Sequence, residues 1–310
     1  MTSESVDRFA EASRIIGDGC ELDFPLASLT TYRVGGRAAV FVKVDEESLL
    51  TSVVKAATVT GLPILVIGRG SNMLVSDAGF RGIAVQLGAF ASRISIGDDH
   101  LVETGSAVLL PVLARRTVAA GLTGFEWAVG VPGTVGGAVR MNAGGHGSDM
   151  AASLVDARIL DWVTGEIDQR SADDLGLRFR GSGLDDGQVV LAARLRLNPG
   201  EQADSERELE EIVRWRRDHQ PGGQNAGSVF VNPVPGEVAA GQLIDGCGLR
   251  GFRIGSAEVS TKHANFIQAD VDGNAADVLA VMSHVRRVVA DKTGHVMRSE
   301  VRLVGFEGPL

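Results

Sequence analysis

The stretch that most constrains what this chain can fold into runs from residue 130 to residue 147 and reads GVPGTVGGAVRMNAGGHG. It contains seven glycines, one proline and no acidic residue. Glycine inside a helix or strand costs about 0.5–1 kcal/mol relative to alanine, so regular structure alone does not explain this density. Bare backbone N–H groups in a glycine-rich loop form a concave site for phosphate. The stretch therefore predicts an anion-binding loop, with a plain turn between two strands as the alternative.

A second, shorter glycine loop lies earlier in the chain. The apolar run PILVI at residues 63–67 is typical of a buried strand, and GRGSNMLVSD follows it at residues 68–77. The side chains of Ser71 and Asn72 can donate hydrogen bonds to phosphate oxygens beside the exposed N–H groups. Two such loops at strand ends, over residues 68–72 and 130–137, suit a long ligand that carries two phosphates.

Length and charge bound the class of protein. A chain of 310 residues predicts two or three domains, and 44% hydrophobic with 22% charged residues indicates a globular chain. The net charge of −9 argues against a nucleic-acid partner, which normally meets a basic face. No apolar run is long enough to span a membrane, and the polar start lacks a signal-peptide core, so we expect a cytoplasmic protein. Cys20 and Cys247 form no C-x-x-C pair, and we expect no metal.

The chain mixes helical and strand patterns in an order that predicts an α+β fold. Helices are expected at residues 6–16, 46–60, 107–120, 173–177, 201–217, 239–244 and 277–293. Strands are expected at residues 38–44, 63–67, 82–87, 94–96, 101–104, 153–161, 166–170, 189–197, 255–259, 264–269 and 298–304. The breaker Asn-Pro-Gly at residues 198–200 marks a boundary, which predicts domains over residues 1–198 and 199–310.

One G-x-G-x-x-G sequence occurs, at residues 246–251. A Rossmann fingerprint must follow a buried strand and open a helix, whereas this one follows the helical pattern AGQLID and opens onto a strand. A helix end and turn is the favoured interpretation. The sequence also lacks G-x-x-x-x-G-K-[ST] and H-E-x-x-H, which disfavours P-loop phosphoryl transfer and a catalytic metal.

Five segments taken together resemble the UDP-N-acetylenolpyruvoylglucosamine reductases of peptidoglycan synthesis. They are TTYRVGG, IGRGSNMLVSD, GVPGTVGGAVRMNAGG, QNAGSVFVNP and KHANFI, and the resemblance covers roughly residues 22–305. The resemblance implies a two-lobed FAD-binding domain of the vanillyl-alcohol-oxidase type, with lobes over about residues 21–87 and 88–198, and then a C-terminal α+β substrate domain. It implies non-covalent FAD held by the two glycine loops. The residues expected to bind it are Gly68, Arg69, Gly70, Ser71, Asn72, Gly130, Pro132, Gly133, Thr134, Gly136, Gly137 and Asn142.

The family's reaction reduces an enolpyruvyl double bond with electrons that NADPH supplies through FAD, and the product is UDP-N-acetylmuramate. Such a reduction leaves an enolate-like charge, which needs fixed donors to stabilise it and a positioned acid to quench it. The resemblance gives these roles to three residues. Ser228 in AGSVFVNP would be the proton donor, Arg180 in FRGS would hold the carboxylate and the enolate, and Glu300 in RSEVRLV would donate a proton or orient the enol.

Each residue also has an interpretation without catalysis: Ser228 as a turn residue, Arg180 as a surface arginine, and Glu300 as an outward-facing strand residue. Asn232, Lys262 and His263 are expected to bind substrate. The further basic residues that could meet its diphosphate are Arg214, Arg216, Arg217 and Arg250. Only small-molecule partners are expected, and a monomer is favoured.

The chain departs from the family pattern at two positions. Phe179 stands where the family usually has tyrosine, and Val231 stands where it often has lysine. A tyrosine-bearing insertion of one subtype is missing, since Tyr32 is the only tyrosine, which indicates the shorter subtype. His146 is interpreted as a loop residue without a covalent bond to flavin. Two other functions stay open from the sequence: a flavin-dependent sugar or alcohol oxidase of the same fold, and a non-catalytic protein that binds flavin or a UDP-sugar.

Overall fold

The computed structural model describes residues 3–308 and divides into two compact units. Unit 1 holds the residues up to Phe24 together with Ala39–Arg69 and Arg81–Arg216. Unit 2 holds Pro25–Ala38, Gly70–Phe80 and the chain from Arg217 onward. Each unit therefore draws on separate stretches of sequence. This division differs from the contiguous domains expected over residues 1–198 and 199–310, and that boundary stays a prediction.

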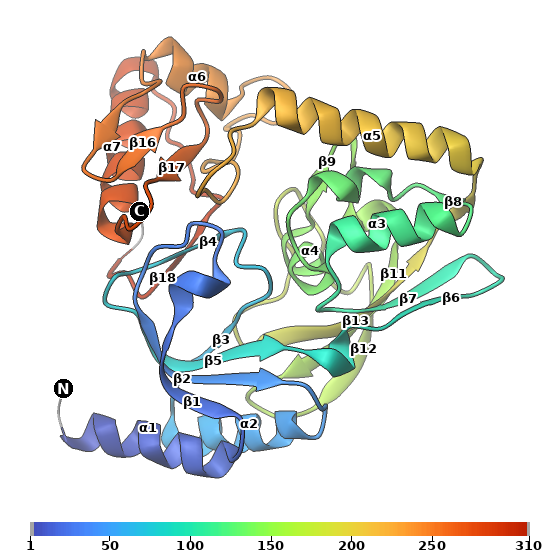
Figure 1. Cartoon of the computed structure of the whole chain (residues 1–310), viewed down its shortest axis with the longest axis vertical. Helices are drawn as coiled ribbons and strands as arrows, with labels where there is room; N and C mark the ends of the chain where they lie inside the picture. Colours follow the sequence, from blue (N-terminus) through green and yellow to red (C-terminus); the bar gives the residue numbers. More distant parts are fainter. Residues whose placement is uncertain (1–2, 309–310) are drawn as a thin grey trace. The chain divides into compact units, whose positions relative to one another are not determined.

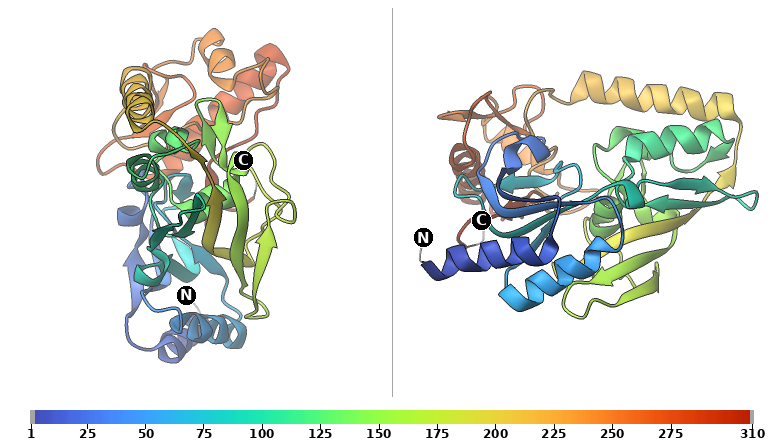
Figure 2. Two further views of the ribbon diagram at one scale, coloured as in Figure 1. Left: turned by 90° about the vertical axis from the view of Figure 1, so that its right-hand side faces the viewer. Right: turned by 60° about the horizontal axis from the view of Figure 1, so that its bottom comes forward.

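Unit 1 begins with a four-stranded sheet covered by two helices. The strands are β1 (Cys20–Pro25), β2 (Arg37–Val44), β3 (Ile64–Val66) and β5 (Phe80–Leu87), in the order β1-β2-β5-β3. The β3 strand runs parallel to β5. Helices α1 (Ser3–Ile16) and α2 (Leu49–Thr60) lie side by side along this sheet (Figures 1 and 2), because their apolar faces and the strands share one buried core.

The larger part of unit 1 is a five-stranded antiparallel sheet in the order β12-β11-β13-β7-β6. Its strands are β6 (Ile94–Ile96), β7 (Leu101–Gly105), β11 (Leu154–Asp161), β12 (Ile167–Ser171) and β13 (Gln188–Arg196). Helices α3 (Leu110–Ala119), α4 (Val135–Met141) and α5 (Gln202–His219) accompany it, and α5 runs beside α3 in both views (Figures 1 and 2). Two short pairs complete the unit: β8 (Leu122–Thr123) with β14 (Asn198–Pro199), and β9 (Gly144–Gly145) with β10 (Ser148–Asp149).

Unit 2 contains a small antiparallel sheet packed on a long helix. Its strands are β15 (Arg253–Ile254), β16 (Ala257–Val259) and β17 (Ile267–Ala269), and helix α7 (Ala275–Thr293) lies against them (Figure 1). Helix α6 (Ala240–Gly246) packs on α7, and β4 (Met73–Val75) pairs in parallel with β18 (Arg302–Val304). The described 3₁₀ helices of the chain are η1 (Leu26–Leu29), η2 (Ala89–Ala91), η3 (Glu126–Gly130) and η4 (Met150–Ala152).

Residues 70–80 organise unit 2 although they lie far from its other segments in sequence. The backbone of Gly35 and Gly36 passes so close to them that a Cβ atom on either glycine would lie 2.3 Å from the carbonyl oxygen of Val75 or Asp77. Only glycine permits this approach. The carboxylate of Asp77 then accepts hydrogen bonds of 2.9 Å from the N–H groups of Ala275 and Ala276, the first two residues of α7.

Most of the expected helices and strands are present, with ends shifted by a few residues. The helix expected at residues 173–177 is wrong, because this segment forms turns. The strand expected at residues 298–304 is confined to β18, since residues 298–300 bond instead to the segment around Phe230. The interpretation of residues 246–251 as a helix end and turn is confirmed: α6 ends at Gly246, and Gly248 has a positive φ of 75°.

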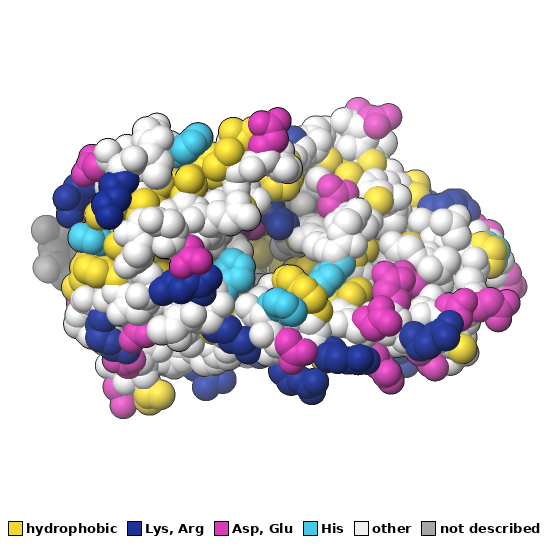
Figure 3. Space-filling view, turned by 90° about the horizontal axis from the view of Figure 1, so that it is seen from above, with side chains coloured by type: hydrophobic (Ala, Val, Ile, Leu, Met, Phe, Trp, Pro, Cys, Tyr) yellow, Lys and Arg dark blue, Asp and Glu magenta, His cyan; other side chains and the backbone are white. Residues whose placement is uncertain are grey.

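Two features of the structure concern the expectation that the protein binds neither a membrane nor a nucleic acid: the character of its helices and the charges on its surface. Within residues 3–308, no helix combines the length and the apolar character that crossing a membrane requires. On the face drawn in Figure 3, Lys and Arg side chains are interspersed with Asp and Glu and form no broad basic field.

We predict that replacing Asp77 with alanine destabilises the protein. The change removes both acceptors at the start of α7 and leaves only the Asn274 cap, so the free energy of unfolding should fall by about 1–2 kcal/mol. Urea denaturation measures this loss. Asp98→Ala, at an exposed aspartate of unit 1, is the control, and an equally small loss in both variants would contradict the prediction.

Candidate active site

The loop after β3 offers a run of free backbone donors. Within the described residues, the N–H groups of residues 68–72 donate no hydrogen bond to the rest of the chain. Gly70 adopts a positive φ of 59°, and a Cβ atom there would lie 2.2 Å from the carbonyl oxygen of Leu29. Gly68 and Arg69 belong to unit 1, and Gly70 begins the segment of unit 2. The loop thus has the donor set that a phosphate group needs.

The second glycine stretch is partly helical. Helix α4 occupies residues Val135–Met141, and Thr134 caps it by accepting a 3.4 Å hydrogen bond from the Gly137 N–H. The N–H of Gly136 donates to the carbonyl of Ser106, 2.9 Å away, so it is directed at the protein and not at an anion. This corrects the expectation of an open loop throughout residues 130–137. The Thr134 N–H stays free of a partner within the described chain.

The two glycine loops touch each other inside unit 1. A Cβ atom added to Gly68 would lie only 2.6 Å from Oγ1 of Thr134. Bare backbone at position 68 is therefore required for this approach, and the two segments that meet here include Gly68, Arg69 and Thr134, whose N–H groups have no acceptor among the described residues. A cradle of this kind, which a side chain would fill, fits the phosphate end of a dinucleotide such as FAD.

Arg180 lies at the tip of a tight turn in unit 1. Arg178 and Gly181 exchange backbone hydrogen bonds of 2.9 and 3.0 Å, and Arg180 between them takes a positive φ of 56°. Its Nη1 donates to the carbonyl of Gly144 at 3.0 Å, and its guanidinium lies 5.5 Å from the ring centre of Phe179. A non-glycine residue with positive φ is uncommon, and such strain is often found at functional sites.

Asn142 holds this turn in place. The residue ends α4 with a φ of 39°, and its side chain is almost fully buried. Its Nδ2 donates to Asp149 Oδ2 at 3.0 Å and to the Arg178 carbonyl at 3.3 Å, and its Oδ1 accepts from the Ala151 N–H at 2.9 Å. Because these contacts engage the whole amide, the structure gives Asn142 a role in positioning the Arg180 turn, and its binding of FAD stays a prediction.

Unit 2 brings Ser228 next to Glu300. The backbone around Ser228 pairs antiparallel with the segment around Glu300: the Glu300 N–H donates to the Val229 carbonyl at 2.8 Å, and the Val231 N–H donates to the Arg298 carbonyl at 2.9 Å. The Asn72 side chain donates to the Glu300 carbonyl at 3.0 Å. Ser228 and Glu300 are both half-buried, so each keeps a route to solvent or ligand.

The three residues expected to bind substrate, which all lie in unit 2, differ in burial and in their hydrogen-bond partners. Asn232 accepts the Ala240 N–H at 3.0 Å and thereby fixes the start of α6. The exposed Lys262 donates to the carbonyl of Arg217 at 2.5 Å. Burial, with a smaller effect of the nearby positive Arg250, lowers the pKa of His263, which favours the neutral imidazole. His263 Nδ1 accepts the N–H of Asn265.

Asn265 is a functional candidate that the sequence alone does not single out. It is 4% exposed and lies in the KHANFI segment, and its side-chain amide bonds to both backbone groups of Phe230, two residues after Ser228. The sequence marks the KHANFI segment as part of the family pattern, but it does not indicate which residue of that segment has a functional role.

Among the four arginines named as diphosphate candidates, Arg216 is the one that is partly buried, whereas Arg214, Arg217 and Arg250 are exposed. Arg250 forms an ion pair with Asp245, and Arg214 is exposed. Arg216 is half-buried near the end of α5, and burial lowers its pKa. Its Cδ would lie 3.1 Å from a Cβ atom on Gly130, and no acceptor for its guanidinium occurs among the described residues. An arginine held in this way beside a glycine loop suits an anionic ligand.

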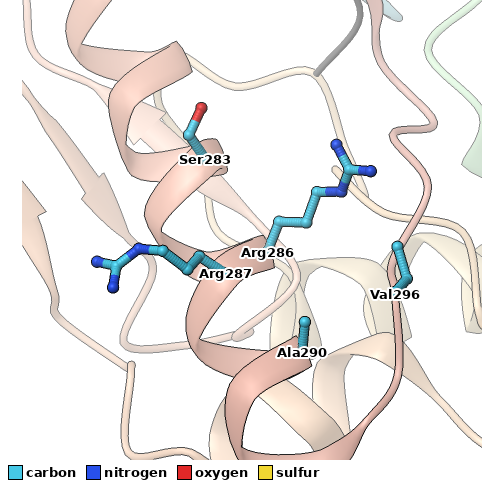
Figure 4. Close-up of a pocket in the computed structure, with 5 residues that line it drawn as sticks. All are labelled: Ser283, Arg286, Arg287, Ala290 and Val296. Carbon is cyan, nitrogen blue, oxygen red and sulfur yellow. The ribbon is translucent and has the colours of Figure 1, made fainter.

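A cavity of about 330 Å³ lies on unit 2, lined by Ser283, Arg286, Arg287, Ala290 and Val296. Figure 4 shows that Arg286 and Arg287 point to opposite sides of α7, so their charges do not converge on one ligand. No residue of the candidate site lines this cavity.

Comparison with known proteins agrees with the geometry. A family model described as the C-terminal domain of UDP-N-acetylenolpyruvoylglucosamine reductase matches residues 219–304, and one described as an FAD binding domain matches residues 38–169. The reductase of that name from Synechococcus sp. (strain RCC307) is 41% identical over 286 residues, which is 91% of this chain and 93% of the relative.

Solved structures give the same picture. The reductase structure from Thermus caldophilus superposes with a TM-score of 0.77 at 32% identity and covers 92% of this chain and 98% of its own. A glucose dehydrogenase, Phl p 4.0202, shares the fold alone, with a TM-score of 0.51 and 14% identity over 94% of this chain and 63% of its own. The α+β class, with an FAD-binding domain of the vanillyl-alcohol-oxidase type and a distinct C-terminal domain, is confirmed.

We predict that Gly68→Ala weakens FAD binding by about 10-fold, because the new methyl group would overlap Thr134 Oγ1 and push the two loops apart. The FAD content and the flavin dissociation constant of the purified variant measure this effect. Gly145→Ala is the matched control, since a Cβ atom at that glycine meets nothing within 4 Å. Equal FAD affinity in the two variants would show that the loops do not meet at the cofactor.

Proposed function

Since the chain belongs to the UDP-N-acetylenolpyruvoylglucosamine reductase family, we propose that Arg180, Ser228 and Glu300 carry the chemistry of that family's reaction in this protein. The reaction is a step of peptidoglycan precursor synthesis, with FAD as cofactor and NADPH as reductant. The observation that carries the proposal is the backbone pairing of Val229 with Glu300, which makes Ser228 and Glu300 neighbours.

FAD held by the glycine loops would supply the two-electron chemistry by which NADPH reduces the enolpyruvyl double bond of the UDP-sugar. The side chains proposed for the site then stabilise and neutralise the negative charge that this reduction places on the substrate. The Arg180 guanidinium holds the substrate carboxylate and, as a fixed donor, stabilises the enolate-like charge beside it. The Ser228 hydroxyl gives its proton to the carbon that bears the carboxylate, and Glu300 orients the enol or supplies a proton.

The pyrophosphate of FAD and the diphosphate of the UDP-sugar need separate hydrogen-bond donors. The backbone N–H groups of residues 68–72, with that of Thr134, would hold the FAD pyrophosphate. Arg216 is the favoured contact for the diphosphate of the UDP-sugar, because its guanidinium is half-buried and has no protein acceptor among the described residues. Asn232 keeps its Nδ2 free for the same ligand, since only its Oδ1 is engaged within the described chain.

We further propose that the enzyme works as a cytoplasmic monomer on small molecules only, with residues 1–198 as the FAD-binding domain and residues 199–310 as the substrate domain. The net charge of −9 and the interspersed charges on the face drawn in Figure 3 support a protein without a nucleic-acid partner. Sedimentation analysis of the purified protein tests the monomer.

Ser228→Ala is expected to separate the two half-reactions. NADPH should still bleach the flavin at the wild-type rate, while reoxidation by UDP-N-acetylglucosamine enolpyruvate should slow by about 10²–10⁴-fold because the acid is missing. Stopped-flow absorbance of the flavin measures both rates. Ser283→Ala, at an exposed serine of α7, is the control. Normal reoxidation in the Ser228 variant would remove this residue as the acid.

Arg216→Ala should raise KM for the sugar nucleotide by about 10-fold to 100-fold with little change in kcat, because a charge-assisted hydrogen bond to the diphosphate is lost. Its FAD content should stay at the wild-type level. Arg214→Ala, two residues away and exposed, is expected to leave KM unchanged. A loss of FAD from the Arg216 variant would assign this arginine to the cofactor instead.

A further inference from the structure

The segment that carries Ser228 is held by one buried side chain. Asn265 Oδ1 accepts the N–H of Phe230 at 3.0 Å, and Asn265 Nδ2 donates to the carbonyl of Phe230 at 2.8 Å. The carbonyl of Asn265 itself accepts the N–H of Val229 at 2.8 Å. A side-chain amide here replaces a strand partner, because it offers one donor and one acceptor at the spacing of a peptide group.

The opposite edge of the same segment is also fully engaged. The Val229 carbonyl accepts from Glu300, and the Val231 N–H donates to Arg298. All backbone polar groups from the Val229 N–H to the Val231 N–H are therefore paired, and Asn265 supplies the partners for Phe230. The chain directly after Ser228 is fixed from both sides.

The chain before Ser228 is not fixed in this way. Gly227 has a positive φ of 75°, and a Cβ atom there would meet nothing within 4 Å. The Gly227 N–H is bonded only locally, to Asn225 Oδ1 at 3.0 Å. Gln224 pairs with Ala269 further upstream, but the backbone hydrogen bonds nearest to Ser228 that reach other segments lie on its C-terminal side, at Val229 and Phe230.

We propose that Asn265 is a positioning residue for proton delivery, which acts on Ser228 through the backbone of Phe230 without touching the substrate. The inference rests on the proposed role of Ser228 as the acid. No other residue type supplies the same contact: aspartate lacks the donor for the Phe230 carbonyl, and glutamine is longer by one methylene group. A shift of the hydroxyl by about 1 Å is enough to cost roughly 10²-fold in a proton transfer that needs close alignment.

The test is a double-mutant cycle of Asn265→Ala and Ser228→Ala, with each half-reaction followed by stopped flow. Asn265→Ala alone should reduce FAD with NADPH at a rate within about two-fold of wild type, and should slow reoxidation by the sugar substrate about 10-fold to 100-fold. The solvent isotope effect on reoxidation should rise, because proton transfer becomes more rate-limiting. In the Ser228→Ala background, the same change should cause no further slowing.

Two controls separate positioning from loss of stability. Asn274→Ala removes the side-chain cap of α7 in the same unit, so it should lower the melting temperature but leave reoxidation and its isotope effect unchanged. Hydrogen exchange of residues 226–231, followed by mass spectrometry, should quicken in the Asn265 variant and not in the Asn274 variant. Asn265→Ser keeps one hydroxyl partner for Phe230 and replaces the alanine variant if that fails to fold.

The outcomes distinguish this inference from the proposed function. Three outcomes would each overturn the positioning role. The rate losses of the two single variants could multiply in the double variant, flavin reduction and reoxidation could slow equally in the Asn265 variant, or this variant could reoxidise at the wild-type rate. Normal reoxidation in Ser228→Ala alone would instead overturn the role of Ser228 as acid, and the inference that rests on it would fall for that separate reason.

Discussion

The close backbone approach of Gly35 and Gly36 to residues 75–77 is the constraint on which unit 2 depends. Any side chain at either glycine would meet a carbonyl oxygen at 2.3 Å, so the two segments can lie together only as bare backbone. This approach sets the position of β4, and β4 in turn pairs with β18. From the same segment, Asp77 caps α7 and Asn72 holds the Glu300 carbonyl. A glutamate of the proposed site is thus placed by a contact far from it in sequence.

Asparagine side chains stabilise the irregular backbone segments that carry the candidate site residues. Asn72 bonds to the carbonyl of Glu300, Asn142 to the turn of Arg180, and Asn265 to both backbone polar groups of Phe230. Irregular backbone lacks a ladder partner, and an asparagine supplies a donor and an acceptor without adding charge to a buried place. The three catalytic candidates therefore gain rigidity without lying on regular helices or strands.

The sequence allowed much of the fold to be predicted, because buried strands such as β2 and β13 contain the apolar runs AAVFV and VVLAA. It did not indicate α4, since a seven-residue helix with two glycines has neither the length nor the periodicity to stand out. The two glycine loops were expected to share a ligand, and the contact of Gly68 with Thr134 explains how they meet. The roles of Asn142 and Asn265 could not be predicted, because an asparagine's function depends on which distant backbone reaches it.

The pairing of β4 with β18 also has a consequence for how the protein is made. Residues 73–75 of β4 leave the ribosome long before residues 302–304 of β18, so β4 stays an unpaired apolar edge until β18 has been synthesised. Unit 1 has all its segments once residue 216 has emerged and can close first. A fragment that starts at residue 219 lacks both β4 and the glycines that position it. Unit 2, which carries the proposed acid, is thus completed after unit 1, and it matures only on a chain whose unit 1 is already synthesised.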